Sequence, residues 1–276
     1  MEYISLSDIA SYKQGRQVPV EEQSFYCEKG MKRFVRIVDF TNPGEAPRYI
    51  NDLGSQYEVD EKSIVMIRYG SQTAGSIVRG ISGIIANNMF QICINDERFD
   101  IDFMYYYLAT PTIKSMLMSS QSSSTMPAIT FGMMRQIQVP IRSIGEQRKI
   151  AHVLSIIDAK IEKNKQINRN LSEQAKAIFE HELLKFKNVP EGWTQGSLID
   201  IADYLNGLAM QKFRPADEEE GIPVLKIKEL RQGFCDTSSE MCSPSIKTEY
   251  IIHDGDVIFS WSGSLLVDFW CGGKCG

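Results

Sequence analysis

Long apolar runs are missing from this sequence: none approaches the roughly 18 consecutive residues that a membrane-spanning helix needs. The first residues, Met1 and Glu2, also lack the basic and apolar regions with which a secretory signal peptide begins. Both absences favour a cytoplasmic protein with no membrane partner. At 276 residues, the chain is long enough for two domains that each bury a core.

Residues that bind metals are also scarce. Three histidines (His152, His181 and His253) are widely separated, and the six cysteines are scattered. Residues 271–275, CGGKC, look like half of a zinc site, but no second cysteine pair or nearby histidine completes it. We therefore expect no metal site, and thiols that stay reduced, as is usual in the cytoplasm.

Catalytic motifs are missing too. The sequence contains no Asn-Pro-Pro-aromatic methyltransferase motif, no glycine-rich phosphate-binding loop and no suitably spaced Ser/His/Asp set. A carboxylate–lysine cluster with the spacing of a nuclease metal site does not occur either. These absences predict a non-catalytic protein that needs no cofactor.

The excess of positive charge that is typical of nucleic-acid-binding proteins is absent, since the net charge is −5. This charge is unevenly distributed: residues 1–145 carry −1, residues 146–187 carry +3 and residues 188–276 carry −7. Because the acidity is concentrated in the last third, the net charge does not exclude DNA as a partner.

Residues 146–187 are the most distinctive segment that is present, because they contain no glycine or proline and many strong helix formers. Apolar residues and two asparagines recur there at alternating steps of four and three, the heptad pattern of a helix that pairs with another helix. The seam consists of Ile150, Leu154, Ile157, Ile161, Asn164, Asn168, Leu171, Ala175 and Ile178. A helix of roughly 60 Å is rarely covered by its own domain, so we expect a coiled-coil partner.

The sequence also repeats itself at an interval of about 190 residues. Residues 6–12 (LSDIASY) recur as residues 198–204 (LIDIADY), residues 35–39 as residues 225–229, and residues 59–71 as residues 252–264. Three matches in the same order at offsets of 190 to 193 residues indicate a tandem duplication. Gly276 corresponds to Gly83, so we expect an incomplete second copy without the counterpart of the long helix.

We predict an α+β fold: a β-rich domain at residues 1–145, a long spacer helix at residues 146–187 and a partial second β-rich domain at residues 188–276. Apolar and alternating runs predict strands at residues 34–40, 63–68, 76–78, 83–94 and 135–140. Residues 99–119 are expected to be helical, and the serine-rich residues 121–127 are expected to form a loop.

This arrangement resembles the specificity subunit of type I restriction–modification systems, in which target-recognition domains alternate with long spacer helices. The most specific similarity is the entry into the long helix. It is carried by Val139-Pro140-Ile141, Glu146-Gln147-Arg148-Lys149-Ile150, Leu154, Ile157-Asp158, Ile161 and Asn164. Gly192-Trp193 resembles the hinge into the second domain, and residues 254–258 with Gly263 resemble a strand and loop of that domain.

The resemblance implies a DNA sequence-recognition subunit whose two domains read the halves of a split double-stranded target. It also implies spacer helices that fix the gap and dock methyltransferase subunits, which methylate adenine and through which a restriction motor subunit joins. A chain with one spacer helix is expected to self-associate through it or to offer its seam to a methyltransferase subunit. The alternative is a coiled-coil adaptor that binds proteins and no DNA.

Base reading requires side chains that offer paired donors and acceptors, such as arginine for guanine and asparagine or glutamine for adenine. Residues 68–73 form a polar glycine loop, and residues 121–125 form a second polar loop. Their candidate contacts are Arg68, Tyr69, Ser71, Gln72, Thr73, Gln121, Ser122 and Ser123. Candidates for phosphate contacts are Lys13, Arg16, Lys32, Arg33, Arg36 and Arg48. Asn87 and Asn88 fit either an adenine contact or a turn.

Overall fold

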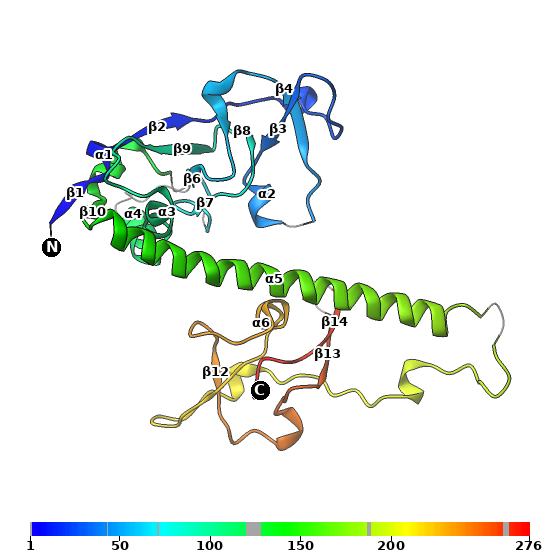
Figure 1. The fold of residues 1–276 in the computed structure, drawn as a ribbon. Helices are drawn as coiled ribbons and strands as arrows, with labels where there is room; N and C mark the ends of the chain where they lie inside the picture. Colours follow the sequence, from blue (N-terminus) through cyan, green and yellow to red (C-terminus); the bar gives the residue numbers. More distant parts are fainter. Residues whose placement is uncertain (1, 43, 71, 120–127, 187–188, 262–264) are drawn as a thin grey trace. The chain divides into compact units, whose positions relative to one another are not determined.

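Two compact units make up the chain in the computed structural model, which describes residues 2–42, 44–70, 72–119, 128–186, 189–261 and 265–276 (Figure 1). The first unit spans Met1–Leu183 and includes the long helix, and the second spans Leu184–Gly276. Both contain strands and helices, so the protein has the α+β fold that the sequence predicts.

Two four-stranded sheets form the body of the first unit, with the strand orders β2-β9-β6-β7 and β4-β3-β8-β5. Their strands are β2 (Ala10–Gln14), β3 (Met31–Val35), β4 (Arg48–Asn51), β5 (Glu58–Val59), β6 (Ile64–Ile67), β7 (Ile77–Val78), β8 (Gly83–Ile85) and β9 (Met89–Ile94). Strands β3 and β8 run parallel, and the other neighbours run antiparallel. A separate pair, β1 (Tyr3–Ser5) with β10 (Gln138–Pro140), joins the two ends of the domain.

Strand β6 lies between two hydrophobic cores because its successive side chains point to opposite faces. Ile64 and Met66 belong to one core, Val65 and Ile67 belong to the other, and all four are buried. The first core also contains residues of helices α1 (Leu6–Ile9), α3 (Ile101–Leu108) and α4 (Pro111–Ser119). A strand covered on both faces explains why the sequence there is a continuous apolar run.

The predicted strand at residues 34–40 is wrong in its second half. Strand β3 ends at Val35, and a short helix, α2 (Val38–Thr41), follows. The Arg36 backbone N–H donates to the Asp39 carboxylate at 2.7 Å, which turns the chain out of the sheet.

Two further segments, each predicted as one element, form two elements in the structure. Residues 83–94 form β8 and β9, divided by a turn in which the Met89 N–H donates to the Ala86 carbonyl at 3.0 Å. Residues 99–119 form α3 and α4, because Pro111 has no backbone N–H with which to continue α3 and instead begins α4. The strand expected at residues 135–140 is shorter, since a 3-10 helix occupies Phe131–Gln136 before β10.

The long helix α5 runs over Ile144–Leu183, so it begins and ends slightly earlier than predicted. Ser143 and Glu146 form a reciprocal cap at its start: the Glu146 N–H donates to the Ser143 hydroxyl at 3.3 Å, and the Ser143 N–H donates to the Glu146 carboxylate at 3.2 Å. Within the helix only Gln147 and Ala151 are buried. The domain therefore covers the first turns of α5 and leaves its remaining turns exposed.

Several elements of the first unit recur in the second. Strands β11 (Ile222–Pro223) and β12 (Met241–Cys242) pair antiparallel as β3 and β4 do, and helix α6 (Ile227–Gln232) takes the sequence position of α2. Strand β13 (Val257–Ser260) matches β6 at the offset of 193 residues and pairs with β14 (Leu266–Phe269), as β6 pairs with β7. The repeat in the sequence is therefore also a repeat of structure.

One part of the second unit differs from its counterpart. Residues 202–206 match β2 but form no strand, whereas β2 pairs with β9 in the first unit. The apolar residues beside this segment lose their cover as well. Leu6 and Ile9 are 0% and 2% exposed, whereas their counterparts Leu198 and Ile201 are 66% and 79% exposed.

Candidate nucleic-acid interface

Three strand ends meet at one end of the β2-β9-β6-β7 sheet. Strand β2 ends at Gln14, which is paired with Phe90 near the start of β9. Strand β6 ends at Ile67, which is paired with Met89 at the start of β9. The residues that follow β2 and β6 and precede β9 are therefore neighbours, although they are far apart in the sequence. We call Gln14, Gln17, Arg68, Asn87 and Asn88 the polar sheet end.

Arg68 ties this cluster together. Its Nη1 donates to Gln14 Oε1 at 2.6 Å, and its Nε donates to the Ile129 carbonyl at 3.1 Å. The Gln14 amide Nε2 donates in turn to the carbonyls of Asn87 and Met89. These contacts fix the amide of Gln14 and the guanidinium of Arg68 in place before any ligand arrives.

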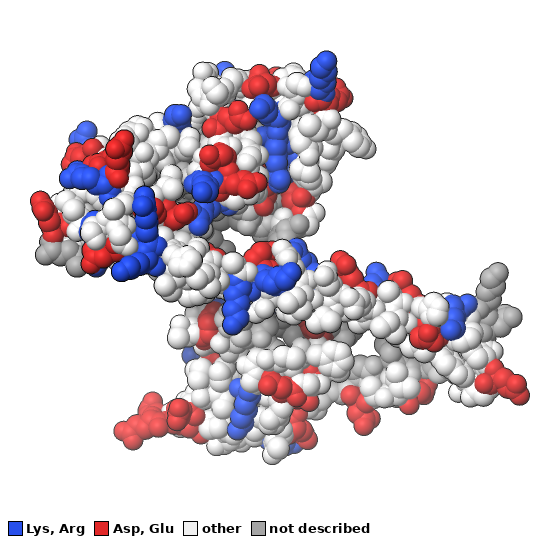
Figure 2. All heavy atoms as spheres, viewed as in Figure 1, with Lys and Arg blue, Asp and Glu red and all other residues white. Residues whose placement is uncertain are grey.

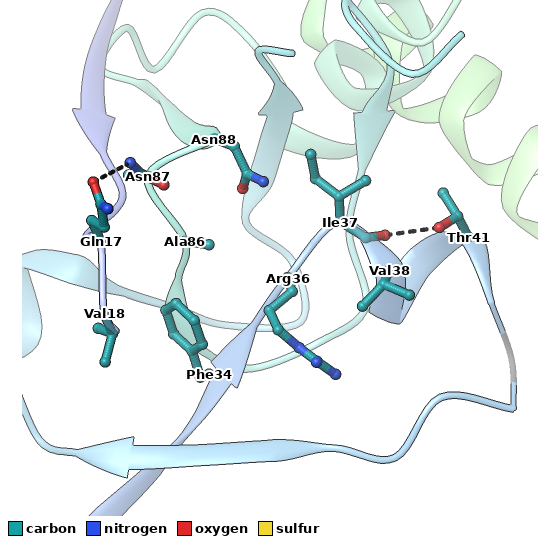
Figure 3. A pocket seen from close by; sticks show the side chains of 10 residues that line it. All are labelled: Gln17, Val18, Phe34, Arg36, Ile37, Val38, Thr41, Ala86, Asn87 and Asn88. Atoms are coloured by element: carbon teal, nitrogen blue, oxygen red, sulfur yellow. Dashed lines mark hydrogen bonds between the residues drawn. The ribbon is translucent and has the colours of Figure 1, made fainter. Parts of the chain in front are cut away.

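A cavity of about 450 Å³ opens beside the polar sheet end (Figure 3). Asn87 Nδ2 donates to Gln17 Oε1 at 3.2 Å across its rim, and both side chains are exposed. Asn88 also lines it, and its Oδ1, which is shielded from solvent, has no hydrogen-bond partner among the described residues. Gly15 allows this close arrangement, because a Cβ there would lie 2.1 Å from the Ala86 carbonyl oxygen.

The predicted glycine loop follows directly after Arg68. Gly70 and Gly75 have φ values of +118° and +77°, which favour glycine over residues with a side chain. The Thr73 hydroxyl donates to the Tyr69 carbonyl at 3.0 Å, and Lys114 Nζ donates to the Gln72 carbonyl at 2.7 Å. The side chain of Gln72 is exposed beside this fixed backbone. Ser71 lies outside the described residues.

The chain returns to the same place after the serine-rich segment. Ala128 forms a bridge with Tyr69, and the Ile129 N–H donates to the Arg68 carbonyl at 2.9 Å. Ala128 and Ile129 therefore adjoin the glycine loop. Gln121, Ser122 and Ser123 themselves lie outside the described residues.

The predicted phosphate-binding residues occupy different surroundings. Arg16 is exposed next to the polar sheet end, where its backbone N–H donates to the Ile85 carbonyl at 2.9 Å. Lys13 is exposed on β2 but lines a second cavity with two acidic residues, Glu58 and Asp60. Arg16, unlike Lys13, is therefore an exposed cation next to the polar sheet end.

Two arginines are engaged within the domain instead. Arg36 forms ion pairs with Asp39 and Glu45, both at 3.1 Å, and Arg33 lies 3.7 Å from Asp39. Arg36 also donates to the Ala46 carbonyl at 2.9 Å. Its charge is balanced by two carboxylates, so Arg36 stabilises its own loop. On the face in Figure 2, basic and acidic side chains are interspersed over the first unit.

Gln14 and Gln17 did not emerge as candidates from the sequence. Their only signal was their position on either side of Gly15, which does not show which residues lie opposite them. Arg68, Gln72 and Asn87 were predicted, and the structure brings them within one region.

The predicted helix-pairing residues lie on α5. Ile150, Ile157, Ile161, Asn164, Asn168 and Leu171 are exposed, and Leu154 is half-buried. Ile157 and Ile161 are about half exposed, at 50% and 48%. The described seam residues from Ile157 to Leu171 are therefore exposed.

Neither a metal cluster nor a membrane span occurs in the described part of the chain: no group of three or more His, Cys, Asp or Glu residues is placed to hold an ion, and no helix is long and apolar enough to cross a bilayer. Of the CGGKC cysteines, Cys271 is exposed and Cys275 is buried. Burial, followed by the neighbouring Cys235, raises the pKa of Cys275 to about 12. Its thiol therefore stays protonated, the form that binds metals poorly.

Known proteins share both the sequence pattern and the fold. The family model described as "Type I restriction modification DNA specificity domain" matches residues 1–173. The type I restriction enzyme MjaIX specificity subunit of Methanocaldococcus jannaschii is 26% identical over 201 residues, which cover 66% of this chain and 46% of the relative. The MjaVIII specificity subunit of the same organism is 25% identical over 280 residues, which cover 94% of this chain and 63% of the relative.

The chain thus spans between about half and two thirds of the length of these curated relatives. Among solved structures, the type I restriction–modification S subunit from M. genitalium matches with a TM-score of 0.53 and 17% identity. That match covers 99% of this chain and 71% of the other. At 17% identity this match shows similarity of fold alone.

Proposed function

The chain belongs to the family of type I restriction modification DNA specificity domains, and from that membership we propose that it is the non-catalytic, sequence-reading subunit of a type I restriction–modification complex. The observation that carries this proposal beyond the family is the polar sheet end. It presents two glutamines, two asparagines and an arginine, the side chains that pair with adenine and guanine edges in the major groove. We place the protein in the cytoplasm with the DNA that it reads.

Within the polar sheet end, the residues have different tasks. Arg68 holds Gln14 at 2.6 Å and so positions it, whereas Gln17 and Asn87, which are exposed and hydrogen-bonded to each other at 3.2 Å, would meet base edges. The exposed side chain of Gln72 extends this surface. Arg16 adds a phosphate contact at its margin.

We propose that the second unit reads the other half of a split target. Its elements β11, α6, β12 and β13 follow the order of β3, α2, β4 and β6 in the first unit, and β13 falls on β6 at the repeat offset. Helix α5 would then separate the two reading domains and set the gap between the half-sites.

The exposed seam of α5 is the proposed docking surface. A helix with half-exposed isoleucines along one stripe favours association, and Asn164 and Asn168 would fix its register. The partner is the same helix of a second copy or a methyltransferase subunit, and the restriction motor subunit would join through the methyltransferase.

The test is reconstitution with a methyltransferase subunit of the same system, followed by sequencing of the adenines that become methylated in a random DNA library. We expect one split sequence. Gln17→Ala should lose about tenfold in discrimination at one position of one half-site, while Gln166→Ala on the exposed face of α5 should change nothing. Arg16→Ala should weaken binding to all sequences alike and lower the salt dependence.

Methylation without any sequence preference would overturn the proposal. If the chain also shows no salt-sensitive DNA binding but holds a stable protein partner, it is an adaptor instead.

A further inference from the structure

Gln147 is a buried polar side chain that the proposed DNA-reading role leaves unexplained. It lies in the first turns of α5 and is 0% exposed, although α5 is otherwise a polar and largely exposed helix. A buried amide is costly unless its donors and acceptor are satisfied.

The amide of Gln147 joins three segments of the first unit. Its Oε1 accepts from the Asp100 N–H at 2.9 Å. Its Nε2 donates to the Arg98 carbonyl at 2.8 Å and to the Arg142 carbonyl at 2.9 Å. Both donor positions of the amide are thus used on backbone carbonyls, one before α3 and one before α5.

Asp100 connects Gln147 to the start of α3. Its carboxylate caps α3 by accepting from the Asp102 and Phe103 N–H groups, each at 3.1 Å, while its own N–H is held by Gln147. The starts of α3 and α5 are therefore fixed to each other through one side chain.

The same face of α5 continues this attachment. Residues 147, 151, 154 and 158 are spaced by four, three and four, which places them along one side of the helix, and α3 packs beside α5. Ala151 is buried, and the Tyr106 hydroxyl donates to Asp158 Oδ2 at 2.7 Å. Burial, followed by the hydrogen bond to Asp158, raises the pKa of Tyr106 to about 12, so this hydroxyl stays protonated as a donor.

We propose that Gln147 is the positioning residue that sets the direction in which α5 leaves the first domain, and through it the number of base pairs between the two half-sites. This inference rests on the proposed function. Past Gln147 the helix continues for about 54 Å, at about 1.5 Å per residue. A change of about 10° in its direction would move its far end by about 9 Å, which is two to three base-pair steps of about 3.4 Å.

The first experiment measures the direction of α5 in the chain alone. Donor and acceptor dyes on azidophenylalanine in place of Lys29 and Gln174, both exposed, report the distance from the domain to the far part of the helix in single molecules. Gln147→Glu, which sets a carboxylate against two carbonyls, should broaden or shift this distance. Gln147→Met removes the hydrogen bonds without burying a charge and should act in the same direction. Gln166→Glu makes the same chemical change at an exposed site of α5 and should not.

The second experiment measures methylation by the reconstituted complex on targets whose half-sites are separated by gaps of different length. Both Gln147 variants should lose about tenfold in preference for the best gap over gaps one base pair longer or shorter, with the base preferences within each half-site unchanged. Arg148→Ala, which removes the ion pair of an exposed arginine with Asp100 at 3.5 Å, should keep the narrow gap preference.

The outcomes separate the two claims. An unchanged dye distance overturns the role of Gln147 whatever the complex does. A changed distance with a gap preference as narrow as that of the wild type overturns its link to spacing. A wild-type complex that methylates no split sequence overturns the proposed function and the spacing role with it, while the dye distance still decides whether Gln147 orients α5.

Discussion

Leu6→Ala and Leu198→Ala remove the same side chain from the same position of the two repeats, in opposite surroundings. Leu6 is fully buried in the core with α3 and α4, whereas Leu198 is 66% exposed. Truncation of a fully buried leucine costs about 3 kcal/mol, from lost apolar burial and the cavity that remains. Truncation of an exposed leucine changes stability by less than about 0.5 kcal/mol. The first substitution should therefore destabilise its unit, and the second should be nearly neutral.

Each unit can be followed separately. Hydrogen exchange measured by mass spectrometry on peptides from β9 and α3 reports opening of the first unit, and Leu6→Ala should accelerate their exchange by about 100-fold. All three tryptophans, Trp193, Trp261 and Trp270, lie in the second unit. Tryptophan fluorescence during urea unfolding therefore reports that unit, and neither substitution should move its midpoint.

Equal destabilisation by Leu6→Ala and Leu198→Ala would refute this reasoning, because it would mean that residues 198–201 are covered as fully as residues 6–9. Ile9→Val and Ile201→Val repeat the comparison with a smaller change. The buried Ile9 should cost about 1 kcal/mol and the exposed Ile201 almost nothing.

Three further results are expected. Gly15→Ala should destabilise the first unit by about 1 to 3 kcal/mol in urea unfolding, because its Cβ would lie 2.1 Å from the Ala86 carbonyl oxygen. Gly145→Ala on α5, where a Cβ meets no atom within 4 Å, should instead stabilise the first unit by about 0.5 kcal/mol. Hydrogen bonds from Ser238 lower the pKa of Asp236 from 3.8 to about 2. Their contribution to the stability of the second unit should therefore be complete above pH 4 and be lost as the pH falls towards 2. An Asp236→Asn chain that keeps the same acid transition in tryptophan fluorescence would contradict this. Ile161→Glu should change the stability of the monomer by less than about 0.5 kcal/mol but weaken self-association in sedimentation velocity, whereas Lys163→Glu should leave self-association unchanged. Equal sedimentation of wild type and Ile161→Glu at high concentration would exclude pairing through this seam.

Local patterns predicted the parts of the fold that depend on local spacing. The apolar run at β6, the helical composition of α5 and the repeated blocks at 6–12 and 59–71 each carry their signal within a few residues. The sequence patterns missed the ends of strands and helices where one chemical group determines the end. Strand β3 ends where the Asp39 carboxylate accepts a hydrogen bond from the Arg36 N–H, and the alternation of apolar residues does not predict such a turn.

The candidate site could be predicted only in part, because its assembly depends on strand register. Arg68 and Gln72 stand in a polar glycine loop and are visible in the sequence. Gln14 becomes part of the site only because β2 and β6 both pair with β9 at the same end. Gln147 was visible only as part of a motif, since a glutamine in a helix of this composition gives no sign of burial.

Photo-cross-linking to DNA tests the central claim most directly. Benzoylphenylalanine in place of Gln17 in the reconstituted complex should form a cross-link to bases of one half of the methylated target, and unlabelled target should compete better than a scrambled sequence. The same residue in place of the exposed Lys29, at the far end of β3 from the polar sheet end, should cross-link weakly or not at all. Absence of any cross-link from position 17 while the complex methylates its target would contradict base reading by the polar sheet end.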